Sequence, residues 1–124
     1  MNSDFEDLFE ELRETVKNHI ADHPVIDDHT DQRRQIDAAV VYQGHVCPLI
    51  HDNITCLNPI LIDGQDGPHL SRGSIGGNVD ARRGVRKGVE EYNRRVDEMV
   101  ASGIPCPSDK ITEVWERGSD WETV

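Results

Sequence analysis

Apolar residues between positions 38 and 62 come in runs of three to five, which limits what this part of the chain can fold into. Short runs rich in Val and Ile, set apart by turn-forming residues, are typical of strands joined by tight turns. The interrupting residues are Gly44, Pro48, Asn53, Asn58 and Pro59. We therefore predict a small antiparallel sheet over residues 38–62, with strands at 38–42, 46–50, 54–57 and 60–62. A helix over residues 31–42 is the alternative for the first strand.

The N-terminal segment, residues 3–21, carries the periodicity of an amphipathic helix. Ser3 and Glu6 have the spacing of a capping box, and Pro24 follows the end of the pattern. Apolar residues recur at steps of three and four along one face: Phe5, Leu8, Phe9, Leu12, Val16 and Ile20. We predict a helix here that packs on the core or presents its acidic side to a partner.

A second amphipathic helix is predicted over about residues 79–102. Its apolar residues form a heptad-like seam: Val85, Val89, Tyr92, Val96 and Met99. Gly103 and Pro105 then end the helix. The seam fits packing on the core, on the first helix or on a helix of another chain.

Together these elements predict an α+β fold and a single domain over residues 1–124. The small sheet over 38–62 is expected to be flanked by the N-terminal and C-terminal amphipathic helices. A Gly-rich loop at 69–78 leads into the second helix, and a tail with two tryptophans occupies 105–124.

The chain is strongly acidic, with 24 acidic against 13 basic residues and a net charge of -11. Such a charge disfavours binding along a nucleic-acid duplex, because phosphates repel it. Three lysines against ten arginines, an excess of Asp over Glu, and only 5% aromatic residues are typical of a salt-adapted, halophilic protein. We take this as a compositional expectation about the source.

Four possible zinc ligands lie within twelve residues: His45, Cys47, His51 and Cys56. Zinc prefers Cys and His in a tetrahedron, and ligands a few residues apart can reach one ion. The sequence therefore predicts a zinc-binding segment, with zinc as the candidate cofactor. Two alternatives remain open: Cys47 is a buried small hydrophobe within a strand, or Cys47 and Cys56 form a disulfide.

Charge is divided unevenly along the chain. The first 31 residues hold ten acidic and two basic side chains. A basic group follows much later: Arg72, Arg82, Arg83, Arg86 and Lys87. Positive charge at the start of a helix opposes the helix dipole, which indicates that another role places it there. Acidic and basic parts could pair within one subunit or between neighbours, and the arginines could also meet nucleic acid locally.

Five residues are the interface candidates: Arg82, Arg83, Arg86, Trp115 and Trp121. The tryptophans could anchor a partner or simply cover the core. We predict protein partners, and either a homo-oligomer or a larger assembly.

The sequence therefore favours a structural or assembly protein, a subunit of an oligomer or a larger particle such as a virion, with zinc as a candidate staple. The alternatives are a small thiol- or metal-dependent enzyme centred on Cys47 and His51, or an acidic nucleic-acid mimic that acts as an inhibitor. We assign no catalytic residue. The expected location is the cytoplasm or a virion, because no apolar run approaches the roughly 20 residues of a membrane span. The acidic N-terminus is also unlike a signal peptide.

Overall fold

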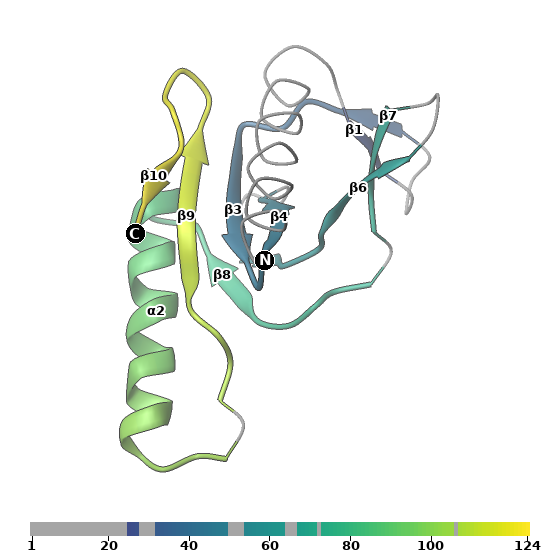
Figure 1. Ribbon diagram of the computed structural model, residues 1–124. Coiled ribbons are helices and arrows are strands. Elements are labelled where there is room, and N and C mark those ends of the chain that lie inside the picture. The colour runs from purple at the N-terminus through teal and green to yellow at the C-terminus, as the bar shows by residue number, and fades with distance from the viewer. Residues whose placement is uncertain (1–24, 28–31, 50–53, 64–66, 72, 106) are drawn as a thin grey trace, which may run out of the picture.

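The computed structural model of the 124-residue chain describes residues 25–27, 32–49, 54–63, 67–71, 73–105 and 107–124. Within these residues it contains ten strands, arranged in three sheets, and one helix (Figure 1). We call the three sheets central, outer and two-stranded.

The central sheet has the strand order β10-β9-β3-β4, and every pair in it is antiparallel. Its strands are β3 (Ala38–Tyr42), β4 (His45–Pro48), β9 (Ile111–Glu116) and β10 (Glu122–Thr123). Strand β3 is buried along its whole length. Successive side chains of a strand point to opposite faces, so Val40 packs in one core cluster and Val41 in another.

The outer sheet covers one face of the central sheet. Its order is β2-β1-β7-β6, with a parallel pair between β1 and β7 and antiparallel pairs elsewhere. The strands are β1 (Val25–Asp27), β2 (Gln32–Arg34), β6 (Ile60–Asp63) and β7 (Gly67–Leu70). The core between the two sheets consists of Val25, Ile36, Ala39, Val41, Val46, Ile60, Leu70 and Trp115.

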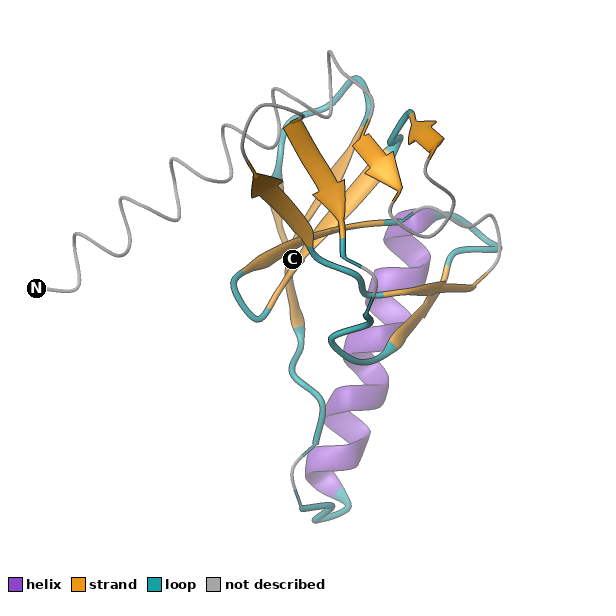
Figure 2. Ribbon diagram, turned by 90° about the vertical axis from the view of Figure 1, so that its right-hand side faces the viewer, coloured by secondary structure: helices purple, strands orange, loops and turns teal. Residues whose placement is uncertain are grey.

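Helix α2 (Val85–Ala101) and the two-stranded sheet cover the other face. The two-stranded sheet pairs β5 (Ile54–Cys56) with β8 (Asn78–Asp80), and Figure 2 shows α2 running beside these strands. The second core lies here: Ala38, Val40, Tyr42, Cys47, Leu49, Leu57, Val79, Val89, Tyr92, Val96, Ile111 and Val114. The predicted helical seam therefore packs on the core of its own chain, through Val89, Tyr92 and Val96.

The α+β prediction is wrong. The described chain is mostly β, with ten strands and one helix, and not one small sheet between two helices. Strands do form at the four predicted places in 38–62, but they belong to different sheets: β3 and β4 to the central, β5 to the two-stranded and β6 to the outer sheet. Strands β3 and β4 pair with each other, but the other partners, β9, β8 and β7, lie outside 38–62 in segments of three to six residues that are too short to show a strand pattern.

Other boundaries also change. Residues 78–80, placed at the end of the Gly-rich loop and the start of the second helix, form β8, and the helix begins only at Val85. The tail over 105–124 contributes β9 and β10 to the central sheet. The helix predicted for residues 3–21 lies outside the described residues. In the part of the chain that is described, no helix is both long enough and apolar enough to cross a membrane.

Candidate functional site

Cys47, the centre of the predicted zinc segment, lies in β4 with its side chain fully buried. Burial raises the pKa of the thiol to about 12, because the charged thiolate is poorly solvated in the core. The sulfur makes a weak contact with the carbonyl oxygen of His45 at 3.7 Å. A nucleophile or metal ligand must be a thiolate, so this environment holds Cys47 in the unreactive form.

The other predicted ligands are not brought to Cys47 in the described residues. His45 is exposed at the start of β4, and Cys56 is exposed on β5 of the two-stranded sheet. Cys47 and Cys56 are both free, so no disulfide joins them. His51 lies outside the described residues. No group of three or more His, Cys, Asp or Glu residues within the described ranges could hold a metal ion, and the zinc site stays a prediction.

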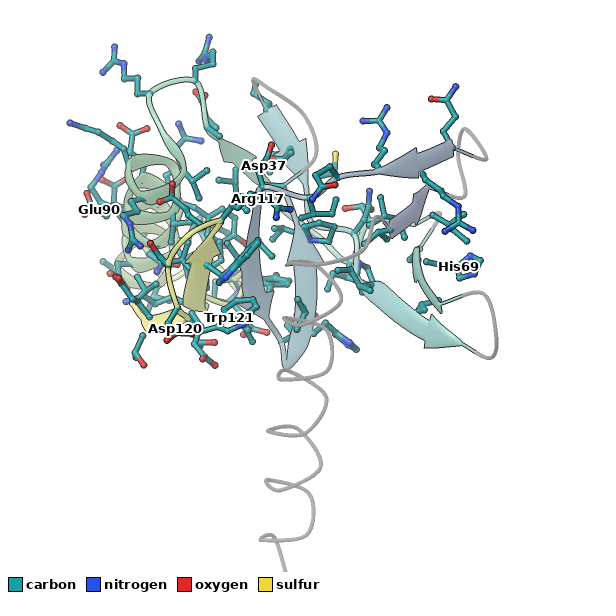
Figure 3. The ribbon with its side chains drawn as sticks, turned by 90° about the horizontal axis from the view of Figure 1, so that it is seen from above. Asp37, His69, Glu90, Arg117, Asp120 and Trp121 are labelled. Carbon is teal, nitrogen blue, oxygen red and sulfur yellow. The ribbon has the colours of Figure 1, made fainter. Side chains whose placement is uncertain are left out.

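The two tryptophans lie together at the β9–β10 hairpin. Trp115 is 2% exposed and packs in the core below the outer sheet, while Trp121 is half-buried beside it, with ring centroids 6.4 Å apart. Arg117 lies over the Trp115 ring at 5.9 Å and donates from its Nε to Asp37 at 3.1 Å. Figure 3 shows Arg117 beside Asp37. Trp115 is therefore a core residue, and only Trp121 has an accessible face.

The predicted basic group builds a cavity where β8 turns into α2. The cavity has a volume of about 400 Å³. Its lining consists of Asp80, Arg82, Arg83, Lys87, Gly88, Glu91 and Arg95. Four basic side chains thus face two carboxylates, in a protein whose net charge is -11. We call this site the cationic cavity.

Asp80 fixes the turn that forms one wall of the cationic cavity. Its carboxylate accepts hydrogen bonds from the Arg82 backbone N–H at 3.1 Å, from Nε at 2.9 Å and from Nη2 at 2.5 Å. These bonds lower the pKa of Asp80 to about 2 and raise that of Arg82. Gly84 follows with φ 113°, a conformation that favours glycine, and α2 begins at the next residue. The Arg82 side chain is therefore paired with Asp80 and stabilises the turn.

Gly88 forms the floor of the cationic cavity and lets α2 approach β8. A Cβ at this position would lie well under 3.0 Å from the Asp80 carbonyl oxygen. The next helical turns add Glu91 and Arg95 to the same side, because Lys87, Glu91 and Arg95 follow one another at steps of four. The cations therefore line a strip along the helix.

Three of the four cavity cations, Arg83, Lys87 and Arg95, are uncompensated. All three are exposed, and within the described ranges no ion pair joins any of them to a carboxylate. Helix α2 also has no acidic residue in its first turn and no side-chain cap, so its N-terminal dipole adds to the positive potential. The site is thus suited to an acidic ligand.

The sequence located this site only in part. Arg82, Arg83 and Lys87 line the cationic cavity as a group, but Arg86 points away and pairs with Glu116 at 3.0 Å and Glu122 at 2.5 Å. Arg72 lies outside the described residues. Sequence reasoning missed Arg95. The four-residue steps from Lys87 were the signal that could have found it.

Comparison of the chain with protein-family models, with curated proteins and with solved structures gave no match. No relative therefore supplies an activity, a ligand or a partner for this chain.

Proposed function

We propose that the protein is a structural subunit that joins an oligomer or a larger particle, such as a virion, by docking an acidic protein surface in the cationic cavity. The observation that carries the proposal is the position of Arg83 and Lys87, exposed and without a carboxylate partner in the described residues of a chain with net charge -11. Two neighbouring cations repel each other, and a bound acidic group would relieve that repulsion.

An acidic protein surface fits the cavity better than a nucleic acid does. Asp80 and Glu91 lie in the lining, and both would repel a phosphate backbone. The remainder of this acidic chain would repel a long polyanion further. A folded partner can instead present a few carboxylates to Arg83, Lys87 and Arg95 and place neutral or basic groups near Asp80 and Glu91.

The buried state of Cys47 argues for a non-catalytic role. The enzyme alternative needs a thiolate at Cys47 with His51 as its base. Burial raises the pKa of that thiol to about 12, so the neutral thiol dominates at neutral pH. Zinc bound by His45, Cys47, His51 and Cys56 stays a separate prediction that neither supports nor weakens docking.

Self-association of the full chain tests the proposal. Sedimentation velocity and native mass spectrometry at about 0.1 M and about 1 M NaCl would report the oligomer and its salt dependence, since surface charges are screened over about 10 Å and about 3 Å at these concentrations. Circular dichroism at each salt concentration checks that the chain stays folded. We expect a defined oligomer at the lower salt concentration that weakens at the higher one.

The variant Arg83→Glu/Lys87→Glu should dissociate this oligomer. Its matched control is Arg94→Glu/Lys110→Glu, which changes the net charge equally at exposed residues outside the cavity. The control should associate like the native chain. A native chain that is monomeric at both salt concentrations, or a cavity variant that associates normally, would overturn the proposal.

A further inference from the structure

The most acidic segment of the chain complements the cationic cavity. Residues 4–14 contain six carboxylates and a single basic residue, Arg13. The carboxylates are Asp4, Glu6, Asp7, Glu10, Glu11 and Glu14. These residues lie outside the described ranges.

We propose that the acidic segment 4–14 of one copy of this chain binds in the cationic cavity of a second copy. The inference rests on the proposed assembly function and names the surface that the cavity docks. The contact is then head to tail, between the N-terminal segment of one copy and the β8–α2 turn of another. If two copies each bind the segment of the other, they form a closed dimer. If each copy binds the segment of the next copy, the assembly continues into a ring or a filament.

Net charge limits how two copies can meet. Each copy carries -11, so most pairs of surfaces repel each other. The first 31 residues hold ten acidic and two basic side chains, whereas the described cavity sets four cations against two carboxylates. A contact between these two regions places the main excess of negative charge against a local excess of positive charge. Electrostatics therefore favours this contact between copies.

The shape of the cationic cavity favours a peptide segment over a small anion. Lys87 and Arg95 both line it and are eight residues apart, which is about 12 Å along the helix axis. One phosphate could contact only one end of such a strip. A segment with carboxylates at several neighbouring positions can reach both ends, and each arginine can hold a carboxylate through two parallel hydrogen bonds.

A charge-swap experiment on the full chain tests this pairing. The variant Glu10→Lys/Glu11→Lys reverses two charges of the segment, and Arg83→Glu/Lys87→Glu reverses two charges of the cavity. We expect each variant alone to raise the dissociation constant of self-association by at least about tenfold. An equimolar mixture should recover association, because an intact segment then meets an intact cavity and the two reversed surfaces also attract each other.

A peptide with the sequence of residues 1–14, labelled with a fluorophore, provides a second readout. It should bind the Glu10→Lys/Glu11→Lys protein, whose cavity is intact, and not the Arg83→Glu/Lys87→Glu protein. The same peptide with Glu10→Gln and Glu11→Gln should bind at least about tenfold more weakly. If the peptide fails to bind while inorganic pyrophosphate binds the Glu10→Lys/Glu11→Lys protein at micromolar concentration in isothermal titration calorimetry, the inference is overturned in favour of a small-anion site.

The outcomes separate this inference from the proposed function. If the segment variant associates like the native chain while the cavity variant does not, the cavity docks another surface and only the occupant proposed here is overturned. If association returns only when all four substitutions are combined in one chain, the segment binds its own cavity and the contact between copies is overturned. A native chain that never associates overturns both proposals.

Discussion

Asn93 of α2 holds both backbone groups of Ile111, the first residue of β9. Its Nδ2 donates to the Ile111 carbonyl oxygen at 3.0 Å, and its Oδ1 accepts from the Ile111 N–H at 2.8 Å. Asn93 is 8% exposed, and Ile111 is buried. A single side chain therefore does at this point what a neighbouring strand does elsewhere in the sheet, and it joins the helix to the central sheet.

Replacing Asn93 by Leu should destabilise the protein strongly. The substitution leaves the buried N–H and C=O of Ile111 without partners, and each such group costs about 1–3 kcal/mol. We expect the free energy of unfolding, measured by urea denaturation, to fall by roughly 2–5 kcal/mol. The neighbouring substitution Arg94→Ala removes only an exposed pair with Glu98 and should change it by less than about 1 kcal/mol. Equal effects of the two substitutions would contradict this account.

Replacing Gly88 by Ala, which adds a single methyl group, should destabilise the protein. Alanine normally stabilises a helix relative to glycine by about 0.5–1 kcal/mol. At Gly88, however, the added Cβ would collide with the Asp80 carbonyl oxygen, which belongs to backbone that cannot easily move. We expect Gly88→Ala to lower the free energy of unfolding by about 1–3 kcal/mol.

Gly73→Ala provides the control for this prediction. A Cβ at Gly73 would meet no atom within 4 Å, so the substitution should be nearly neutral. The pair can be compared by thermal or urea unfolding under one condition. If Gly88→Ala proves as stable as the native chain, α2 and β8 do not pack as closely as the structure shows.

The sequence predicted local structure better than strand pairing. Val40, Val41 and Tyr42 favour a strand, and the strand is present. Thr55 of β5 pairs with Val79 of β8 and not with a neighbouring strand. Such a choice is decided by contacts between distant segments, and three- or four-residue strands carry no pattern that reveals the partner. The parallel pair of β1 and β7 joins residues more than forty positions apart, as in Ile26 and His69.

The same limit applies to the candidate site. Arg82, Arg83 and Lys87 were found because they are close in sequence and share a charge. Arg86 belongs to the same cluster in sequence, but Glu116 and Glu122 attract it to the other side of the helix. Those partners lie thirty or more residues away, so composition and spacing could not separate Arg86 from its neighbours.

Cys47 and Cys56 should differ sharply in reactivity. With Cys106 replaced by Ser to leave two thiols, a thiol reagent such as iodoacetamide should modify exposed Cys56 in the folded protein and reach buried Cys47 only after unfolding. Peptide mass mapping would separate the two sites. Labelling with and without a chelator serves as the control, because a zinc-bound thiolate would become reactive when the metal is removed. Rapid labelling of Cys47 in the native protein would contradict its placement in the core.

The raised pKa of Cys47 also predicts a pH dependence at the alkaline end. The folded value of about 12 exceeds the ordinary value of 9.0, so the folded chain holds this proton more tightly than the unfolded chain. The stability that results is fully present below pH 9 and is lost as the pH rises toward 12. Cys47→Ala removes the titrating group, and its unfolding free energy should fall less steeply than that of the native chain over this interval.

Asp80 predicts the opposite dependence at the acidic end. The hydrogen bonds from the Arg82 side chain lower the pKa of Asp80 to about 2, below its ordinary value of 3.8. The folded state therefore gains from this carboxylate above pH 3.8 and loses that gain as the pH falls toward 2. The difference in stability between the native chain and Asp80→Asn should be constant above about pH 5 and shrink below pH 3.8. Carboxyl chemical shifts followed by NMR would report the pKa directly, and a value near 3.8 would show that Arg82 does not hold the turn in solution. Arg82 would then be a fourth free cation of the cavity, and Arg82→Glu should weaken self-association as much as a reversal at Arg83.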